Sequence, residues 1–347
     1  MDLDIPTREL EGLLTLMFLP SVGAVKSLRL SKKFLTLQNI LADPEWCQKN
    51  LKKSWKEPEI QKANEQAVKV LETADAQPGT RIIHYYDARY PRFLKLIHPF
   101  PPPILFLKGD LTDLERSVAV VGTRSPTDLA KRITRLITTQ IVGKDWIIVS
   151  GLALGIDTIA HETAIHEKGR TIAVLPGSLD QITPKQNQVL ADKILSNGGL
   201  LLTEEFFGTI PTKGHFIKRD RIQSGLSVAV FAIQSGIGGG TRHTIIDALI
   251  QERLLYVPPS PKTYGHSSDL EKDWANDVLP RLTGSELLNI FESNKLPRPQ
   301  AFTKLMRSEY SDRPVAMEVS KDHYPIIFQN LEEKLEYLRG KASSGNL

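Results

Sequence analysis

The sequence predicts an α/β protein whose core is a doubly wound, mostly parallel β-sheet. Six short apolar runs each end at a small or polar turn, and most are separated by an amphipathic segment of helix length. Strands that alternate with helices imply right-handed crossovers and parallel pairing. The turns after the strands then share the carboxyl edge of the sheet, where open α/β folds bind ligands. The six runs are 118–121, 147–149, 171–175, 200–202, 228–233 and 254–257.

The composition is that of a folded, soluble protein. The 347 residues suffice for two or three domains, and 41% of them are hydrophobic. The net charge of +4 is a mild basic bias that identifies no partner by itself. The single cysteine, Cys47, excludes an intramolecular disulfide and a multi-cysteine metal site, which fits a reducing cytosol. No signal peptide and no apolar stretch of membrane length is evident, so we expect a cytoplasmic protein without a membrane partner.

Residues 1–78 are predicted to form a small helical domain. Apolar residues at 13–18 precede a short turn at 20–26, which contains Gly23 and opens a second helix. This hairpin resembles those of helix–hairpin–helix and SAM-like modules, which can present N–H groups to a phosphate. A plain connection between two helices is the favoured alternative.

Residues 79–292 are predicted to form the sheet domain. It begins with a strand at 82–86, and prolines within 99–103 interrupt regular structure before an apolar run at 104–107. After about residue 290 the pattern weakens. Residues 293–347 are therefore predicted to be a C-terminal tail with one helix over 324–339 and without a clear winged-helix pattern.

The turn within residues 147–157 is the most informative connection. Its apolar start predicts a strand buried on both faces, Ser150 and Gly151 form the turn, and a helix follows from Ile156. The first turn of such a helix has unpaired N–H groups and a partial positive charge, so it attracts anions.

Two common nucleotide fingerprints are missing. No Gly-x-x-x-x-Gly-Lys-Ser/Thr segment is present, which disfavours ATP hydrolysis by a P-loop. Gly151 and Gly155 are too far apart for the dinucleotide motif, and no second glycine follows Gly122 at the right spacing. We therefore expect no bound cofactor.

The most glycine-rich segment lies at residues 236–241, between a predicted strand and a helix. Three consecutive glycines, which end at Gly240 before Thr241, would allow a phosphate to approach the backbone closely. A tight turn without a ligand explains the glycines equally well.

Basic residues from separate segments are predicted to converge at the carboxyl edge. Lys218, Arg219 and Arg221 lie close together, and Arg124 and Arg242 follow two other strands. Such convergence favours binding to a phosphate backbone, since the planar guanidinium meets phosphate with two hydrogen bonds. Nearby, Asp220 partly offsets this charge, and Phe216 could stack on a base or belong to the core.

No catalytic constellation is evident. Asp157 and His161 lie four residues apart on one helix, where a metal or acid–base pair is conceivable. We favour the interpretation that Asp157 bonds within the turn and that His161 is packed and hydrogen-bonded. Glu204, Glu205 and His243 have no supporting partners, so we expect a protein without enzymatic activity.

The motifs, taken together, resemble the DprA/Smf family of DNA-processing proteins. They occur in the family's order over roughly residues 80–260. The matching segments are Tyr90-Pro91 with Leu94, 105–109, 118–124, 149–157 with Ala160-His161, 169–175, Thr183-Pro184 with Asn187, Phe216 with Arg219 and Arg221, and 225–227.

The resemblance implies an extended Rossmann fold, a homodimer, and a basic pocket for single-stranded DNA. It also implies a mediator that protects DNA strands and loads the RecA recombinase, as in natural transformation. Carried over by position, the candidate pocket residues are Gly122, Arg124, Ser150, Gly151, Lys218, Arg219 and Arg221, to which the glycine-rich loop adds Gly240, Thr241 and Arg242.

The sequence departs from the family pattern at three places. Asp220 replaces the asparagine of the family's Arg-Asn-Arg, and Gln234 replaces a glutamate. The loop at 236–241 is faintly similar to LOG-type phosphoribohydrolases, but no glutamate follows it. The alternative function is therefore a nucleotide-binding sensor or a nucleotide glycosidase that uses this loop, and a further one is a scaffold that recruits a recombinase.

Overall fold

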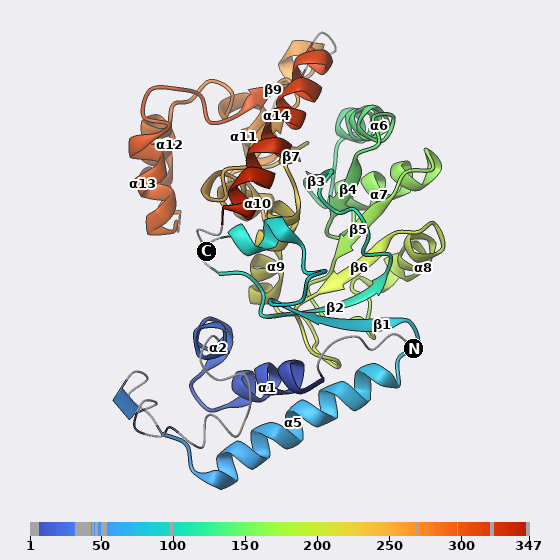
Figure 1. Cartoon of the computed structure of the whole chain (residues 1–347). Coiled ribbons are helices and arrows are strands. Elements are labelled where there is room, and N and C mark those ends of the chain that lie inside the picture. The colour runs from blue at the N-terminus through green and yellow to red at the C-terminus, as the bar shows by residue number, and fades with distance from the viewer. Residues whose placement is uncertain are drawn as a thin grey trace.

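The computed structural model describes residues 7–31, 43, 45, 48–49, 54–97, 100–267, 270–296, 298–319 and 323–344. Cys47 and the first six residues lie outside this set. One nine-stranded sheet crosses the molecule, with helices on both faces and a helical N-terminal region below it (Figure 1). In the described part of the chain, no helix is long and apolar enough to cross a membrane.

The sheet confirms the predicted doubly wound topology. The strand order is β1-β2-β6-β5-β4-β3-β7-β8-β9. Strand β2 runs in the opposite direction to the other strands of this sheet. All six predicted core strands form. The strands are β1 (Thr80–His84), β2 (Ile104–Gly109), β3 (Ser117–Val121), β4 (Ile147–Ser150), β5 (Thr171–Val174), β6 (Leu200–Thr203), β7 (Ala229–Ala232), β8 (Leu254–Val257) and β9 (Met317–Glu318).

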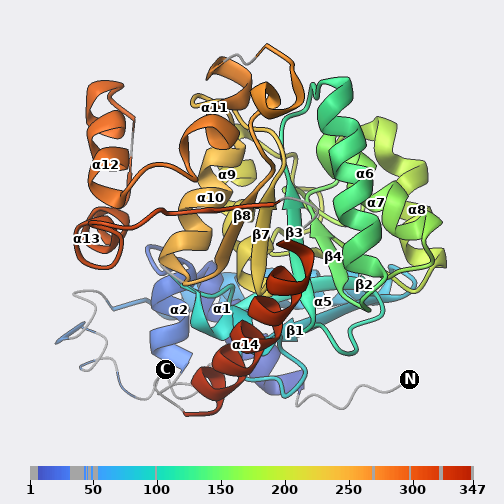
Figure 2. The same ribbon diagram turned by 90° about the horizontal axis from the view of Figure 1, so that it is seen from above.

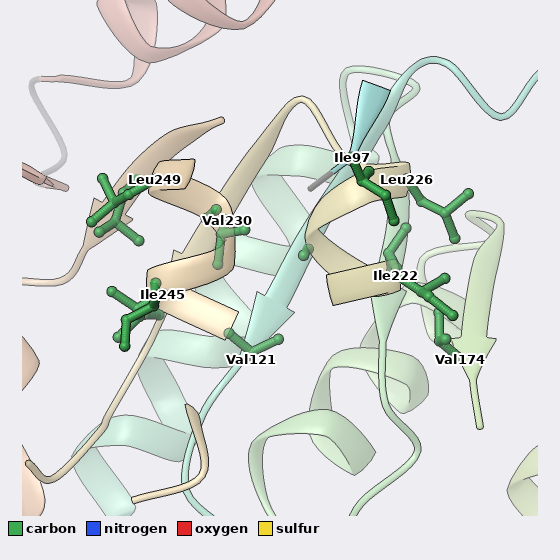
Figure 3. Packing of buried hydrophobic residues seen from close by; sticks show 14 of the residues in the cluster. Ile97, Val121, Val174, Ile222, Leu226, Val230, Ile245 and Leu249 are labelled. Atoms are coloured by element: carbon green, nitrogen blue, oxygen red, sulfur yellow. The ribbon is translucent and has the colours of Figure 1, made fainter. Parts of the chain in front are cut away.

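Alternation along the strands divides the core between the two faces of the sheet. Val118 and Val120 of β3 pack on one side, whereas Ala119 and Val121 pack on the other. The first side is covered by α6 (Asp128–Val142), α7 (Ile156–His166) and α14 (Tyr324–Ser343), with α8 (Gln188–Ser196) further along. The second side is covered by α9 (Lys213–Leu226), α10 (Thr241–Ile250) and the short helix η1 (Arg92–Leu96). Figure 3 shows apolar side chains of α9 and α10 on this side, with Ile97 just after η1.

The N-terminal helices pack against the sheet edge near β1. They are α1 (Thr7–Phe18), α2 (Gly23–Ser31) and α5 (Glu57–Asp75). The α1–α2 turn uses left-handed backbone at Ser21 (φ 70°) and Gly23 (φ 62°), and the Lys26 ammonium donates to the Ser21 carbonyl. Phe18 contacts Phe206 in the loop after β6, with ring centroids 4.9 Å apart, so this helical region touches the carboxyl edge of the sheet.

The C-terminal residues belong to the same core as the sheet, which differs from the expected tail. The expected boundary at residue 292 falls inside α12 (Gly284–Ser293), which is followed by α13 (Gln300–Ser308). Strand β9 then adds to the sheet beside β8, and α14 lies across the strands (Figure 2). Leu331 and Leu335 of α14 are buried against β3 and α6. A two-residue strand carries no sequence pattern, so this attachment was not predictable, although the helix itself was.

We expect Leu331→Ala to destabilise the whole sheet domain. The side chain is fully buried, so its truncation should lower the free energy of unfolding by about 2–5 kcal/mol. Ile326→Ala on the same helix is the control, since Ile326 is 58% exposed. This substitution should change the free energy of unfolding by no more than about 0.5 kcal/mol. Urea unfolding followed by circular dichroism measures both. Equal, small effects would show that α14 is a detachable tail.

Candidate nucleic-acid interface

The candidate site lies where the chain leaves β3 and β7, two neighbouring strands that continue to opposite sides of the sheet. Such a switch point is where open α/β sheets form a ligand crevice. In this protein Gln234 joins the two turns at the switch point. The Gln234 backbone carbonyl accepts a hydrogen bond from Thr123 N (2.9 Å), and the Gln234 Oε1 accepts one from Thr127 N (3.0 Å). The Gln234 amide also donates to Asp273 (2.6 Å) in α11 (Leu270–Val278). Gln234, one of the departures from the family pattern, therefore ties the two turns and α11 together.

Two backbone donors of the turn at 151–155 bond to a carboxylate of the following helix. The N–H groups of Gly151 and Ala153 donate to Asp157 Oδ2 (3.1 and 3.4 Å), and that of Ile156 donates to the Thr123 carbonyl. These groups are therefore engaged within the protein rather than free for an anion. The interpretation of Asp157 as a group that bonds within the turn is confirmed.

His161 is a packed core side chain, as we expected. It is fully buried, and its Nδ1 lies 2.7 Å from Thr171 Oγ1. Burial, aided by the nearby Arg219 charge, lowers the pKa of His161 to about 3, so the ring is neutral. Among the residues that the structure describes, no three His, Cys, Asp or Glu side chains are placed to share a metal ion.

Gly122, Ser150 and Gly151 provide close packing at the strand ends. A Cβ added at Gly122 would lie 2.6 Å from Ile156 Cγ1, so glycine lets α7 approach β3. Ser150 is buried and donates to the Val120 carbonyl (2.7 Å). A Cβ at Gly151 would overlap the Arg219 guanidinium, which therefore lies directly on the turn.

Arg219 is buried and engaged by the protein itself. Its Nη1 donates to the Val174 carbonyl at the end of β5 (2.7 Å), and its Nε lies 3.2 Å from Asp220 Oδ1. Only 5% of the residue is exposed. Its charge is thus compensated inside the fold and fixes α9 to the ends of β4 and β5.

Arg221 and Lys218 are held by the two glutamates after β6. Arg221 Nη2 donates to Glu204 Oε2 (2.7 Å), and its guanidinium lies 5.2 Å from the Phe100 ring centroid. Lys218 Nζ lies 2.9 Å from Glu205 Oε1 and 3.4 Å from Glu204 Oε2. The two basic residues and the two glutamates thus form one ion network, in which Arg221 is buried and Lys218 is partly exposed. Glu204 and Glu205 follow a strand directly, which was the available signal for their role.

Buried carboxylates dominate the electrostatics between α9 and α10. Burial raises the pKa of Asp220 to about 7 and that of Asp247 to about 8, and Asp220 further raises the latter. Burial also raises the pKa of Asp157, against the opposing effect of Arg219. For these three carboxyl groups, the cost of burying the charged form outweighs the attraction of the neighbouring arginines.

Arg124 and Lys213 are exposed cations at this edge of the sheet, whereas Lys218 is partly exposed and paired with Glu205. Arg124 is exposed, with its guanidinium 4.9 Å from the ring centroid of Phe216 in the first turns of α9. Lys213, one helical turn before Phe216, is also exposed. We call these three residues the Arg124 surface. Sequence reasoning named Phe216 and Arg124 but did not select Lys213.

The glycine-rich loop is covered on one side. A Cβ at Gly236 would overlap the Glu271 carbonyl of α11, and Gly239 N donates to the Gly236 carbonyl (3.0 Å), which closes a tight turn. Gly240 is exposed and Thr241 begins α10. Arg242 is buried, with its guanidinium 5.9 Å from the Phe291 ring of α12, so it adds no free charge to the Arg124 surface.

The fold and site define a class of protein: a doubly wound α/β protein with a cationic and aromatic surface at the carboxyl edge of its sheet. A sequence model for the family described as DNA recombination-mediator protein A matches residues 81–278. The chain belongs to this family.

Relatives in the family share the central part of the chain. The DNA processing protein DprA of Bacillus subtilis is 41% identical over 185 residues, which are 53% of this chain and 62% of that protein. The protein Smf of Escherichia coli is 34% identical over 186 residues, 53% of this chain and 50% of that one. The crystal structure of DprA from Streptococcus pneumoniae aligns with 68% of this chain and 86% of that chain, at 29% identity and a TM-score of 0.51. The sequence matches thus span only half to three fifths of the first two proteins.

We expect Asp220→Asn to stabilise the protein at neutral and alkaline pH. A buried acid whose pKa rises from its usual value to about 7 contributes stability at low pH, which is lost as the pH rises from about 4 to 7. At pH 8 the asparagine variant should therefore gain on the order of 2–4 kcal/mol, and the gain should shrink toward pH 5.

Asp128→Asn is the matched control for this experiment, because Asp128 is exposed and pairs only with Lys131 on its own helix. Thermal unfolding of the three proteins across this pH range measures the difference. A gain for Asp220→Asn that does not change with pH would contradict the assignment.

Proposed function

We propose that this protein is a cytoplasmic, non-enzymatic recombination mediator that binds single-stranded DNA through the Arg124 surface. In this role it would protect incoming or processed strands and load RecA, as in natural transformation. Membership of a DNA recombination-mediator family supports the proposal. The observation that carries it is the pairing of the exposed Arg124 guanidinium with the Phe216 ring beside Lys213.

This combination suits a single strand rather than a duplex. Unpaired bases can stack on aromatic rings and on guanidinium planes, whereas the bases of a duplex are enclosed. Arg124 and Lys213 can meet phosphates next to a stacked base. Such contacts read no base edges, so binding should depend little on sequence.

The buried members of the predicted pocket would support this surface from beneath. Arg219 and Arg221 fix α9, whose first turns carry Lys213 and Phe216. Gly122, Ser150 and Gly151 let the turns below pack closely. A site fixed in this way loses little entropy when it binds.

The nucleotide-binding and glycosidase alternative is less well supported. Helix α11 packs directly on Gly236, and Arg242 is buried over Phe291. The loop also lacks a following glutamate, since Arg242, His243 and Thr244 occupy those positions. We therefore do not propose this function.

Titration of a labelled oligothymidine tests the proposal. Arg124→Ala should weaken binding by about tenfold and reduce the slope of log K against log salt by about 0.7, because one phosphate contact is lost. Phe216→Ala should weaken binding by about 1–3 kcal/mol without changing the slope, because stacking is not ionic. A duplex of the same length should bind more weakly.

Lys193→Ala is the control variant, since Lys193 is an exposed lysine on α8. It should bind DNA as the unchanged protein does. The proposal fails if no binding is detected at low salt, or if Arg124→Ala behaves like Lys193→Ala.

We further propose a homodimer that recruits RecA. Light scattering after size exclusion should give twice the monomer mass, and RecA should be retained by the immobilised protein more strongly when single-stranded DNA is present. Retention that is equal with and without DNA would instead support a scaffold that contacts the recombinase alone. A monomeric mass would contradict the dimer without affecting the DNA proposal.

A further inference from the structure

A cavity in the described part of the chain lies away from the Arg124 surface. It has a volume of about 560 Å³, within the range of small-molecule sites. The turn before β8 forms one wall, the segment 309–317 that leads to β9 forms the second, and α14 forms the third. Figure 2 shows these three parts side by side. The cavity lies where β8 begins, whereas the Arg124 surface lies where β3 ends.

Two cations reach this cavity from different walls without a carboxylate partner. Lys334 of α14 lies over the Tyr337 ring (4.1 Å from Nζ to the centroid), and no ion pair joins it to an acid among the described residues. Arg313 donates from Nε to the Glu309 carbonyl (2.6 Å) and lies 4.6 Å from the Tyr310 ring. Its terminal nitrogens have no acidic partner in that part of the chain either.

The most enclosed carboxylate of the cavity is already committed. Glu252 accepts from the Tyr337 hydroxyl (2.6 Å) and from Lys341 Nζ (2.7 Å), one bond on each oxygen. Glu333 Oε1 accepts from the Gln329 amide (2.8 Å). Glu309 also lines the cavity and, like Glu252, favours the charged form of Lys334, but in the described part of the chain neither acid forms an ion pair with Lys334 or Arg313.

The remaining lining is apolar. Leu249, Leu255 and Val315 are buried beside the cavity. A ligand that carried only charge would leave this part of the cavity uncovered, whereas an anion with an apolar or ring-shaped body would fill both parts.

We propose that this cavity binds a small organic anion, a phosphate or carboxylate on an apolar or ring-shaped body, with Lys334 and Arg313 holding the charged group. The site is built from the end of α10 and the turn after it, β8, the segment before β9, and α14. It is independent of the proposed DNA function, because none of its residues belongs to the Arg124 surface.

Calorimetric titration of the full chain with phenyl phosphate and with benzoate tests the proposal. At least one probe should bind in the millimolar range or tighter, and which one binds distinguishes a phosphate site from a carboxylate site. Lys334→Gln and Arg313→Gln should each weaken binding by about tenfold, the effect of losing one charge-assisted hydrogen bond. Lys334→Arg, which keeps the charge, should retain most of the affinity.

Proton uptake provides a second measurement. Burial lowers the pKa of Lys334 to about 8, so at about pH 8.5 an anion beside it should raise that pKa and draw a proton from solvent. Titrations in two buffers of different ionisation enthalpy should therefore differ for the unchanged protein and agree for Lys334→Gln.

Lys304→Gln and Arg307→Gln, which change exposed cations of α13, are the controls. They should leave binding unchanged, and saturating oligothymidine should not displace the probe. The proposal is overturned if neither probe binds, or if the Lys334 and Arg313 variants bind as tightly as these controls.

Discussion

The buried guanidinium of Arg219 is the contact on which the carboxyl edge of the sheet depends. It joins α9 to the end of β5 through the Val174 carbonyl and lies directly on Gly151 at the end of β4. It also faces the buried carboxylates Asp157 and Asp220. Removing a buried cation from such a place leaves the charges of its partners uncompensated. The stability lost in this way exceeds the stability that the intact ion pair contributes. One side chain thus fixes the positions of three segments that are distant in the sequence.

The same helix shows why a cluster of basic residues does not by itself locate a binding surface. Lys213 and Phe216 lie in the first turns of α9, which extend beyond the strand ends and remain in contact with solvent. From Arg219 onward the helix passes between the sheet, η1 and α10, so every residue to Leu226 is buried. Spacing along a sequence gives the face of a helix but not the point at which the helix becomes covered. For that reason the exposed cations Arg124 and Lys213 are not among the residues that the cluster emphasised.

The sequence was sufficient for what depends on local pattern. Apolar runs such as 118–121 and 228–233 predict buried parallel strands, and the bonding of Asp157 within the turn follows from its place after a strand-to-helix turn. The features that the sequence could not predict depend on contacts between distant segments. Gln234 bridges two turns and α11, Glu204 and Glu205 neutralise Arg221 and Lys218, and β9 consists of two residues. None of these has a periodicity or motif of its own.

Helix α10 connects the two ends of the molecule that carry the proposed sites. It begins at Thr241, beside the glycine-rich loop, and the turn that follows it contributes Glu252 to the cavity near α14. Coupling between two sites requires an element with two arrangements that both ligands bias. Ile245 and Leu249 instead fix α10 in the core (Figure 3), and Asp247 of the same helix interacts electrostatically with Asp220 and Arg221 of α9. A helix that is packed along its whole length has no alternative arrangement that a ligand could stabilise. The structure therefore favours two proposed sites that act independently.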